Sequence, residues 1–147
     1  MARYVTTVRT AQSPAEVFAY MADLRNFAQW DPGVKKVVQV KGEAGGADAA
    51  FDVTVSGTTL RYVTEVYEPN SSLLVVAKST TLTSTDRVTV VADGATTLVT
   101  YDAVLELNGV LRFADPLLGL AFGRIGDRAA AGLRRELDGE DVPHDWV

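Results

Sequence analysis

The sequence contains no cysteine and a single histidine, His144, close to the C-terminal end. Without cysteine the chain can form no disulfide, no thiolate nucleophile and none of the common structural zinc sites. One histidine beside a proline in a polar tail also argues against a Ser-His-Asp triad and against a histidine-based metal site. We therefore expect neither a metal ion nor a cofactor.

Long apolar runs and an excess of positive charge are missing as well. No stretch approaches the roughly 18 apolar residues of a membrane span, and the N-terminus MARYVTTVRT lacks the apolar core of a signal peptide. The formal net charge of −5 argues against nucleic-acid binding, which depends on clustered Lys and Arg. We expect a cytoplasmic protein with no nucleic-acid partner and no integral membrane association. The sequence predicts no particular oligomeric state.

The chain has the size and composition of one globular domain. Its 147 residues are 47% hydrophobic and 22% charged, which suits one buried core but not two. Helical sequence continues almost to Gly139, so residues 1–139 are predicted to form the domain. The remaining residues, 140–147, are acidic and interrupted by proline, and we expect this tail to be loose.

Strand-like sequence fills most of the chain. Alternating side chains in the first segment, and β-branched residues in six later segments separated by turn residues, predict seven strands. The predicted strands are Ala2–Thr10, Val34–Val40, Ala49–Val55, Leu60–Glu68, Leu73–Ser79, Leu82–Ala92 and Thr97–Leu107. Because the later strands follow one another with short connections, they predict an antiparallel meander.

Two short helices and one long helix are predicted around these strands. Ser13-Pro14-Ala15-Glu16 has the sequence of a capping box, so a helix begins there and ends near Asp23. One further turn spans Asn26 to Trp30, before Asp31-Pro32-Gly33 ends it. A long helix begins at Asp115-Pro116. Its apolar stripe, which we expect to face the sheet, comprises Leu118, Phe122, Ile125, Ala129, Leu133 and Leu137.

Three segments resemble those of a known superfamily: Ser13 to Phe18, Leu24 to Pro32, and the closing helix after Asn108-Gly109. The chain resembles the START-like, Bet v 1-like (SRPBCC) superfamily, in particular its bacterial polyketide cyclase/dehydrase and lipid-transport branch. The most characteristic part is Trp30-Asp31-Pro32, at the end of the second segment. The resemblance implies an α+β helix-grip fold, in which a curved antiparallel sheet grips the C-terminal helix. Two short helices would close one end, with a cavity between.

A cavity is also expected from the residues themselves. One helix cannot fill a curved sheet of this size without large side chains, and only 8% of the residues are aromatic. Strand alternation and the helical stripe select the side chains that would line the cavity and bind a ligand. These residues are Phe51, Val53, Val55, Leu60, Tyr62, Val88, Val99, Tyr101, Ala103, Leu118, Phe122 and Ile125.

Three polar side chains stand out on the strand faces. Tyr62 and Tyr101 would each place a hydroxyl among apolar neighbours, where it needs a partner that is either a ligand or the protein and its water. Asp86 falls on the inner side of its strand, where burial would raise its pKa, as in a general acid or base. Alternatively, distortion of the strand leaves Asp86 in water. Phe27 and Trp30 are predicted to close the end of the domain, with ligand recognition as the less favoured alternative.

Glycines at helical spacing mark the first half of the long helix. Gly119, Gly123 and Gly126 form a strip without side chains. Such a strip favours either close packing of the helix on the sheet or a helix end loose enough to open the cavity.

Three functional hypotheses follow. The first is a binder or carrier of a small hydrophobic metabolite, such as a lipid, a polyketide or an isoprenoid-like molecule. The second, which the resemblance implies, is a polyketide cyclase or dehydratase acting on the same ligands. In that enzyme Asp86 would transfer the proton, and Tyr62 or Tyr101 would donate to the substrate oxygen. The third is a protein-interaction module with an apolar patch near Phe113 and Leu117. We rank the binder first because no histidine, cysteine or paired carboxylates converge by spacing.

Overall fold

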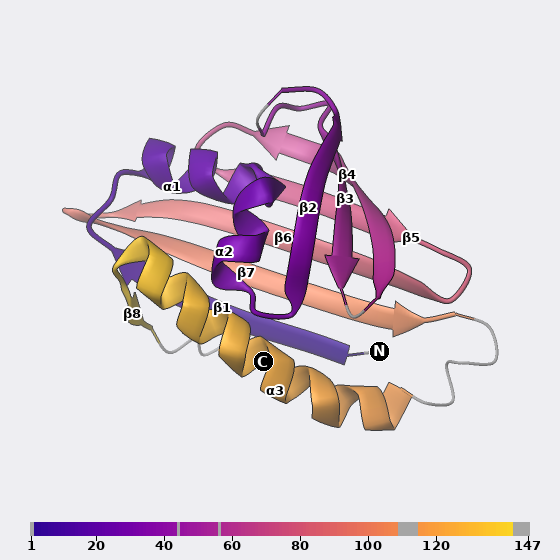
Figure 1. Ribbon diagram of the computed structural model, residues 1–147. Coiled ribbons are helices and arrows are strands. Elements are labelled where there is room, and N and C mark those ends of the chain that lie inside the picture. The colour runs from indigo at the N-terminus through magenta and orange to yellow at the C-terminus, as the bar shows by residue number, and fades with distance from the viewer. Residues whose placement is uncertain (1, 44, 56, 109–114, 143–147) are drawn as a thin grey trace.

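The computed structural model describes residues 2–43, 45–55, 57–108 and 115–142, without the side chains of residues 115–120 and 141 (Figure 1). Within these residues, an eight-stranded antiparallel sheet has the order β2-β3-β4-β5-β6-β7-β1-β8. The strands are β1 (Ala2–Thr10), β2 (Val34–Lys41), β3 (Ala50–Val55), β4 (Thr58–Glu68), β5 (Ser72–Lys78), β6 (Leu82–Asp93), β7 (Thr96–Leu107) and β8 (Glu140–Asp141). The helical elements are α1 (Pro14–Ala22), the 3-10 turn η1 (Leu24–Asn26), α2 (Phe27–Trp30) and α3 (Asp115–Leu137).

The sheet confirms the predicted meander and the α+β helix-grip architecture. Strands β2 to β7 pair with one another in sequence order, and each predicted strand agrees with the observed bounds to within two residues. β1 completes the meander by pairing with β7, from Ala2 opposite Leu105 to Thr10 opposite Thr97. Figure 1 shows α1 and α2 covering one part of the sheet and α3 lying along β1.

The capping box at the start of α1 forms as predicted. The Ser13 hydroxyl accepts from the Glu16 N–H at 3.2 Å, and the Glu16 carboxylate accepts from the Ser13 N–H at 3.3 Å. Two N–H groups at the helix start are thereby satisfied. The buried side of α1, which includes Val17, Phe18 and Met21, packs toward β6 and β7. This orientation places the end of α1 and the following turns over the inner face of the sheet.

The segment after α3 extends the sheet, whereas the sequence predicted a loose tail from residue 140. Glu140–Asp141 pairs with Arg9 and Val8 of β1, and the Val142 N–H donates to the Thr7 carbonyl at 2.9 Å. Gly139 allows this pairing, because a Cβ at this position would lie 2.5 Å from the Arg9 carbonyl oxygen. The open edge of β1 supplies the backbone partners, which composition alone did not reveal.

The long helix packs on β1 through a stripe rotated from the predicted one. Ala129, Leu133 and Leu137 are buried as expected, but Ile125 is 46% exposed and does not face the sheet. Gly126 takes the inward position instead, because the Tyr4 ring occupies the space where its Cβ would be. At this glycine the structure therefore favours close packing over a loose helix end. The side chain of Leu118 and the packing of Gly119 lie outside the described part of the structure.

A second glycine brings α3 against the backbone of α2. A Cβ on Gly132 would overlap the carbonyl oxygen of Trp30 and lie 2.8 Å from its carbonyl carbon. No side chain separates the two helices at this point. The position of Trp30 over the sheet consequently depends on the absence of a side chain at residue 132.

Replacing Gly132 by Ala is predicted to lower the free energy of unfolding by about 1–3 kcal/mol, the usual effect of overpacking. Gly123→Ala is a matched control on the same helix, because no described atom lies within 4 Å of its Cβ position. That control should be neutral or stabilise the protein by up to about 1 kcal/mol through helix propensity. Urea unfolding followed by circular dichroism measures both. Equal effects of the two substitutions would contradict the close contact.

Candidate functional site

An internal cavity lies between the inner face of the sheet and the elements α1, η1 and α2. Its lining residues are Met21, Leu24, Phe27, Trp30, Leu73, Val75, Asp86, Val88 and Tyr101. The lining is apolar except for the Asp86 carboxylate, the Tyr101 hydroxyl and the indole N–H of Trp30. The volume of about 20 Å³ is enough for one water molecule, which needs at least roughly 10–15 Å³ by the same measure. A metabolite would have to widen this cavity.

The cavity differs in position from the one expected from the sequence. It was expected against Tyr62, Tyr101 and the first half of the C-terminal helix, whereas no described lining residue comes from α3. Its wall is instead formed by α1, η1 and α2, because α3 lies along β1 rather than across the centre of the sheet. The contributions of Met21, Leu24, Leu73 and Val75 to the lining were not predicted from the sequence. The apolar spacing of their helix and strands indicated that these side chains are buried, but not that they line the cavity.

The predicted ligand-binding residues separate into groups. Val88 and Tyr101 line the cavity. The others on the inner strand faces belong to the surrounding core and are buried or half-buried: Phe51, Val53, Val55, Leu60, Tyr62, Val99 and Ala103. On α3, Phe122 is half-buried against this core, the side chain of Leu118 lies outside the described residues, and Ile125 is exposed, contrary to expectation.

Asp86 occupies the inner face at the centre of the sheet. In β6 it pairs with Val75 of β5 on one side and with Ala103 of β7 on the other. Strand alternation, with Ser84 and Val88 on the same face, turns its side chain inward. Only 3% of Asp86 is exposed, so the alternative of a solvated aspartate is wrong.

The carboxylate of Asp86 is held by a chain of hydroxyl groups. The Tyr101 hydroxyl donates to Oδ2 at 2.6 Å, and the Ser84 hydroxyl donates to Oδ1 at 3.2 Å. The Tyr62 hydroxyl in turn donates to Ser84 Oγ at 2.8 Å. All four side chains are buried. The two tyrosines singled out from the sequence therefore do find partners within the protein, and both connect to the same aspartate.

Burial raises the pKa of Asp86 from 3.8 to about 6, although the hydrogen bonds from Tyr101 and Ser84 act in the opposite direction. The negative charges of Asp31 and Asp102 raise the pKa further. Burial also raises the pKa of Tyr62 and of Tyr101 well above the ordinary value of 10.0. Both tyrosines thus remain hydrogen-bond donors at neutral pH, while Asp86 can exchange a proton near neutrality.

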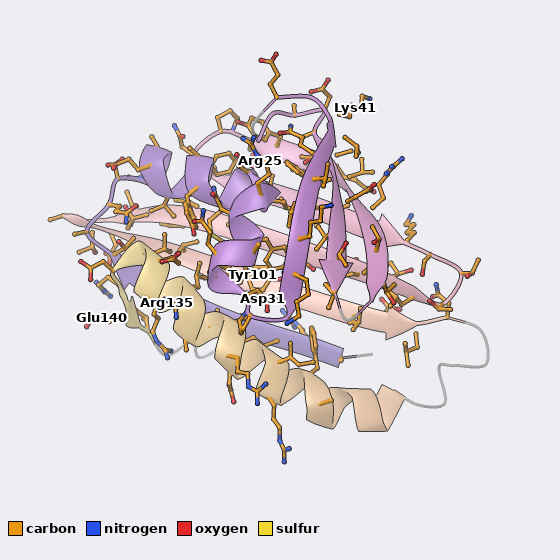
Figure 2. All side chains as sticks on the ribbon, in the orientation of Figure 1. Arg25, Asp31, Lys41, Tyr101, Arg135 and Glu140 are labelled. Atoms are coloured by element: carbon orange, nitrogen blue, oxygen red, sulfur yellow. The ribbon has the colours of Figure 1, made fainter. Side chains whose placement is uncertain are left out.

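Asp31 is a second carboxylate that acts on the same site. Desolvation raises its pKa, while the hydrogen bond from the Gly33 N–H, 2.9 Å long, acts against this increase. Its charge raises the pKa of Asp86, Tyr62 and Tyr101. Figure 2 labels Tyr101 and also Asp31, which follows α2 where the chain turns into β2. Sequence analysis found no converging carboxylates, because residues 31 and 86 are brought together only by the fold.

Three aromatic rings form the wall beside Asp86. The Phe27 and Trp30 rings stack with centroids 4.7 Å apart, and Trp30 meets Tyr101 edge to face at 5.1 Å. Phe27 lies 6.5 Å from Tyr101 in a similar arrangement. Phe27 and Trp30 are buried and cover the sheet, as expected of residues that close the domain end. They also line the cavity, the position that the less favoured alternative, ligand recognition, would require.

One buried hydroxyl near this site has no partner. Among the described side chains, Thr64 Oγ1 is the buried polar atom without a hydrogen bond. Thr64 pairs with Val75, which lies between it and Asp86, and it does not line the cavity. Across the described part of the chain, no three His, Cys, Asp or Glu residues are close enough to hold a metal ion.

A curved antiparallel sheet closed by helices over an apolar cavity is the START-like, helix-grip type of ligand-binding fold. A family model described as polyketide cyclase/dehydrase and lipid transport matches residues 1–138, and the chain belongs to this family. No curated protein sequence matches the chain. None of the described helices is long and apolar enough to cross a bilayer.

Several solved structures share the fold. A START superfamily protein from Mycobacterium smegmatis superposes with a TM-score of 0.69 at 19% identity, covering 94% of this chain and 98% of that one. The Zhui aromatase/cyclase from Streptomyces sp. R1128 gives a TM-score of 0.67 at 15% identity, covering 92% and 93%. The di-domain aromatase/cyclase StfQ of steffimycin biosynthesis gives 0.60 at 12% identity, covering 92% and 51%. At these low identities, the superpositions show a common fold.

The raised pKa of Asp86 predicts a stability that falls with pH. Between its unfolded pKa of 3.8 and its folded pKa of about 6, the folded protein binds more protons than the unfolded chain. The contribution of Asp86 to the free energy of unfolding is therefore largest below pH 4. It should decrease by about 3 kcal/mol as the pH rises through 6. Urea unfolding of the wild type and of Asp86→Asn between pH 4 and 7.5 measures the difference.

The control for this prediction is Asp52→Asn. The hydrogen bonds from Arg61 lower the pKa of Asp52, so its contribution has the opposite sign and is lost as the pH falls through the folded pKa. A stability difference between wild type and Asp86→Asn that does not change with pH would show that Asp86 has an ordinary pKa.

Proposed function

We propose that this protein binds and carries a small hydrophobic molecule, of the lipid, polyketide or isoprenoid type, in the cavity beneath α1, η1 and α2. The observation that supports this proposal is an apolar cavity with one polar corner, formed by Asp86 and Tyr101. Small-molecule sites typically combine a mainly apolar lining with a few polar groups that orient the ligand. The family to which the chain belongs includes lipid transport in its description.

Polar contacts have to contribute to the affinity. Enclosing roughly 300 Å² of apolar ligand surface provides about 7 kcal/mol at 25 cal/mol/Å². Association opposes this with an estimated 4–15 kcal/mol. Burial alone therefore gives weak binding, and the corner of Asp86 and Tyr101 is the place where a polar ligand atom would add affinity.

The helical wall is the part that can move to admit a ligand. η1 and α2 contain three and four residues, and such short helices depend on tertiary packing rather than on their own hydrogen bonds. Met21 adds a flexible side chain to the same wall. The opposite wall belongs to the paired strands β5, β6 and β7, which are held on both sides.

Binding can be followed through Trp30. The sequence has two tryptophans, Trp30 and Trp146, so Trp146→Phe leaves the cavity residue as the single indole. We expect organic extraction and mass spectrometry of the purified protein to yield an apolar molecule, and its return to the delipidated variant to change Trp30 fluorescence saturably. Absence of a co-purified molecule together with an unchanged spectrum for a panel of fatty acids, isoprenoid alcohols and aromatic polyketides would contradict the proposal.

Val88→Ile is predicted to weaken ligand binding at least about tenfold, because the added methyl group fills a cavity that holds only about one water molecule. Val90→Ile is the matched control, since Val90 is 4% exposed on the same strand face but does not line the cavity. Both variants should lose similar stability, and only Val88→Ile should lose affinity in the Trp30 assay. Equal affinities would place the ligand elsewhere.

The second candidate function is an enzyme acting on the same ligands, and the buried Asp86 favours it. Cyclisation or dehydration of a polycarbonyl chain requires a base that removes a proton beside a carbonyl and a donor that stabilises the enolate. Asp86, with a pKa raised to about 6, suits the first role. Tyr101 donates to the ionised Asp86, so it would take the second role only once Asp86 has accepted the substrate proton. Tyr62 contacts Ser84 rather than the cavity, so it would act through the hydrogen-bond chain.

In a cyclase or dehydratase assay, Asp86→Asn should reduce turnover by about two to four orders of magnitude while leaving ligand affinity nearly unchanged. Tyr101→Phe should reduce turnover less, because Asp86 keeps the hydrogen bond from Ser84. A variant with full turnover would remove Asp86 from the mechanism, and a variant that loses only affinity would return the protein to the carrier class. The interaction-module hypothesis concerned Phe113 and the side chain of Leu117, which lie outside the described residues.

A further inference from the structure

The hydrogen-bond chain around Asp86 uses every hydroxyl proton that it contains. An ionised carboxylate can only accept, so Ser84 must donate its single proton to Asp86. Tyr62 must then donate its own proton to Ser84, because Ser84 has no second proton to give. Tyr101 donates to the other carboxylate oxygen. The directions of all three hydrogen bonds follow from the charge on Asp86.

The polar corner of the cavity therefore offers acceptors to a ligand. Asp86 and Tyr101 form the polar corner of the cavity, and the indole N–H of Trp30 is a further donor among the lining side chains. A carboxylate has about four lone-pair sites, and the described contacts use two of those on Asp86. The Tyr101 oxygen keeps a lone pair that can accept a hydrogen bond, but its proton already bonds to Asp86. The Thr64 hydroxyl has no hydrogen-bond partner, but it does not serve as a donor to a ligand because Thr64 is not a lining residue.

The electrostatics of the corner point in the same direction. No described lining residue is cationic, and the charges that act on Asp86 are the carboxylates of Asp31 and Asp102. The aromatic rings of Phe27, Trp30 and Tyr101 border the same space, and their faces carry partial negative charge that attracts cations. A positively polarised ligand group is stabilised here, whereas a carbonyl oxygen meets negative charge.

We propose that the cavity selects apolar molecules whose polar end is a hydrogen-bond donor, a hydroxyl or an ammonium group, over molecules of the same shape that carry only an acceptor. This inference rests on the proposed binding function and specifies the chemical class of its ligand. A donor group on the ligand can bond to a free lone pair of Asp86, and the hydrogen bonds among Tyr62, Ser84, Asp86 and Tyr101 stay as they are. At the corner formed by Asp86 and Tyr101, a ketone would have to take the proton of Tyr101, which would leave a buried carboxylate oxygen short of a hydrogen bond.

The test compares three probes of one shape: 4-tert-butylcyclohexanol, 4-tert-butylcyclohexylamine and 4-tert-butylcyclohexanone. The alcohol and the amine do not absorb where tryptophan does, and the ketone has only a weak carbonyl band there, so Trp30 fluorescence in the Trp146→Phe variant, corrected for ketone absorption, reports binding at pH 7.5. We expect the alcohol and the ammonium each to bind at least about tenfold more tightly than the ketone. A hydrogen bond to a charged group contributes roughly this much, since tenfold corresponds to about 1.4 kcal/mol.

The outcomes separate this inference from the proposed function. If the ketone binds as tightly as both donors, or more tightly, the inference is wrong and the cavity is still an apolar binding site. If the ammonium binds tightly and the alcohol only as well as the ketone, the site selects charge rather than hydrogen-bond donation, which also overturns the inference. If none of the three binds, the proposed function itself fails.

Asp86→Asn links the preference to this side chain. Its amide oxygen can still accept from Tyr101, and its NH₂ group adds a donor, so the ratio of alcohol to ketone affinity should fall toward one. Asp52→Asn, which removes an exposed carboxylate bonded to Arg61, should keep the wild-type ratio. An unchanged ratio in Asp86→Asn would show that another group selects the ligand. The wild-type series decides the matter even if Asp86→Asn does not fold.

Discussion

Placing the carboxylate of Asp86 among apolar side chains is unfavourable unless hydrogen bonds compensate for the water it loses. Tyr101 and Ser84 supply two such bonds, and Tyr62 supports Ser84. This requirement links four side chains of the inner sheet face, on β4, β6 and β7, into one polar network. It also leaves the corner formed by Asp86 and Tyr101 with free acceptor positions, while the hydroxyl protons of the network are all used within it.

The two walls of the cavity differ in how firmly they are held. The strands that carry Asp86 and Tyr101 pair with neighbours on both sides. The opposite wall depends on short helical turns, whose position is set by the direct contact between Gly132 and the Trp30 backbone. The polar groups thus keep a fixed geometry while the aromatic wall can adjust to the size of a ligand. A carrier and an enzyme would both use this combination.

The family description covers cyclisation, dehydration and lipid transport, and one fold can support many functions. The polar groups among the described lining residues are one carboxylate, one phenol and one indole N–H, with a second carboxylate, Asp31, acting at longer range. These groups are sufficient to orient a ligand and, in the enzymatic alternative, to move a proton. The difference between the two roles lies in whether the bound molecule has an acidic C–H bond near Asp86.

The sequence by itself determined the strands, the capped helix and the inward direction of Asp86, Tyr62 and Tyr101, because strand alternation and capping are local properties. The tertiary structure decided the rest. Residues 31 and 86 come within electrostatic range only when α2 folds over the sheet. Ile125 turned outward because Gly126 fits against Tyr4, a contact between distant segments. The place of the cavity under α2, rather than against α3, follows from the same long-range packing, which no local pattern encodes.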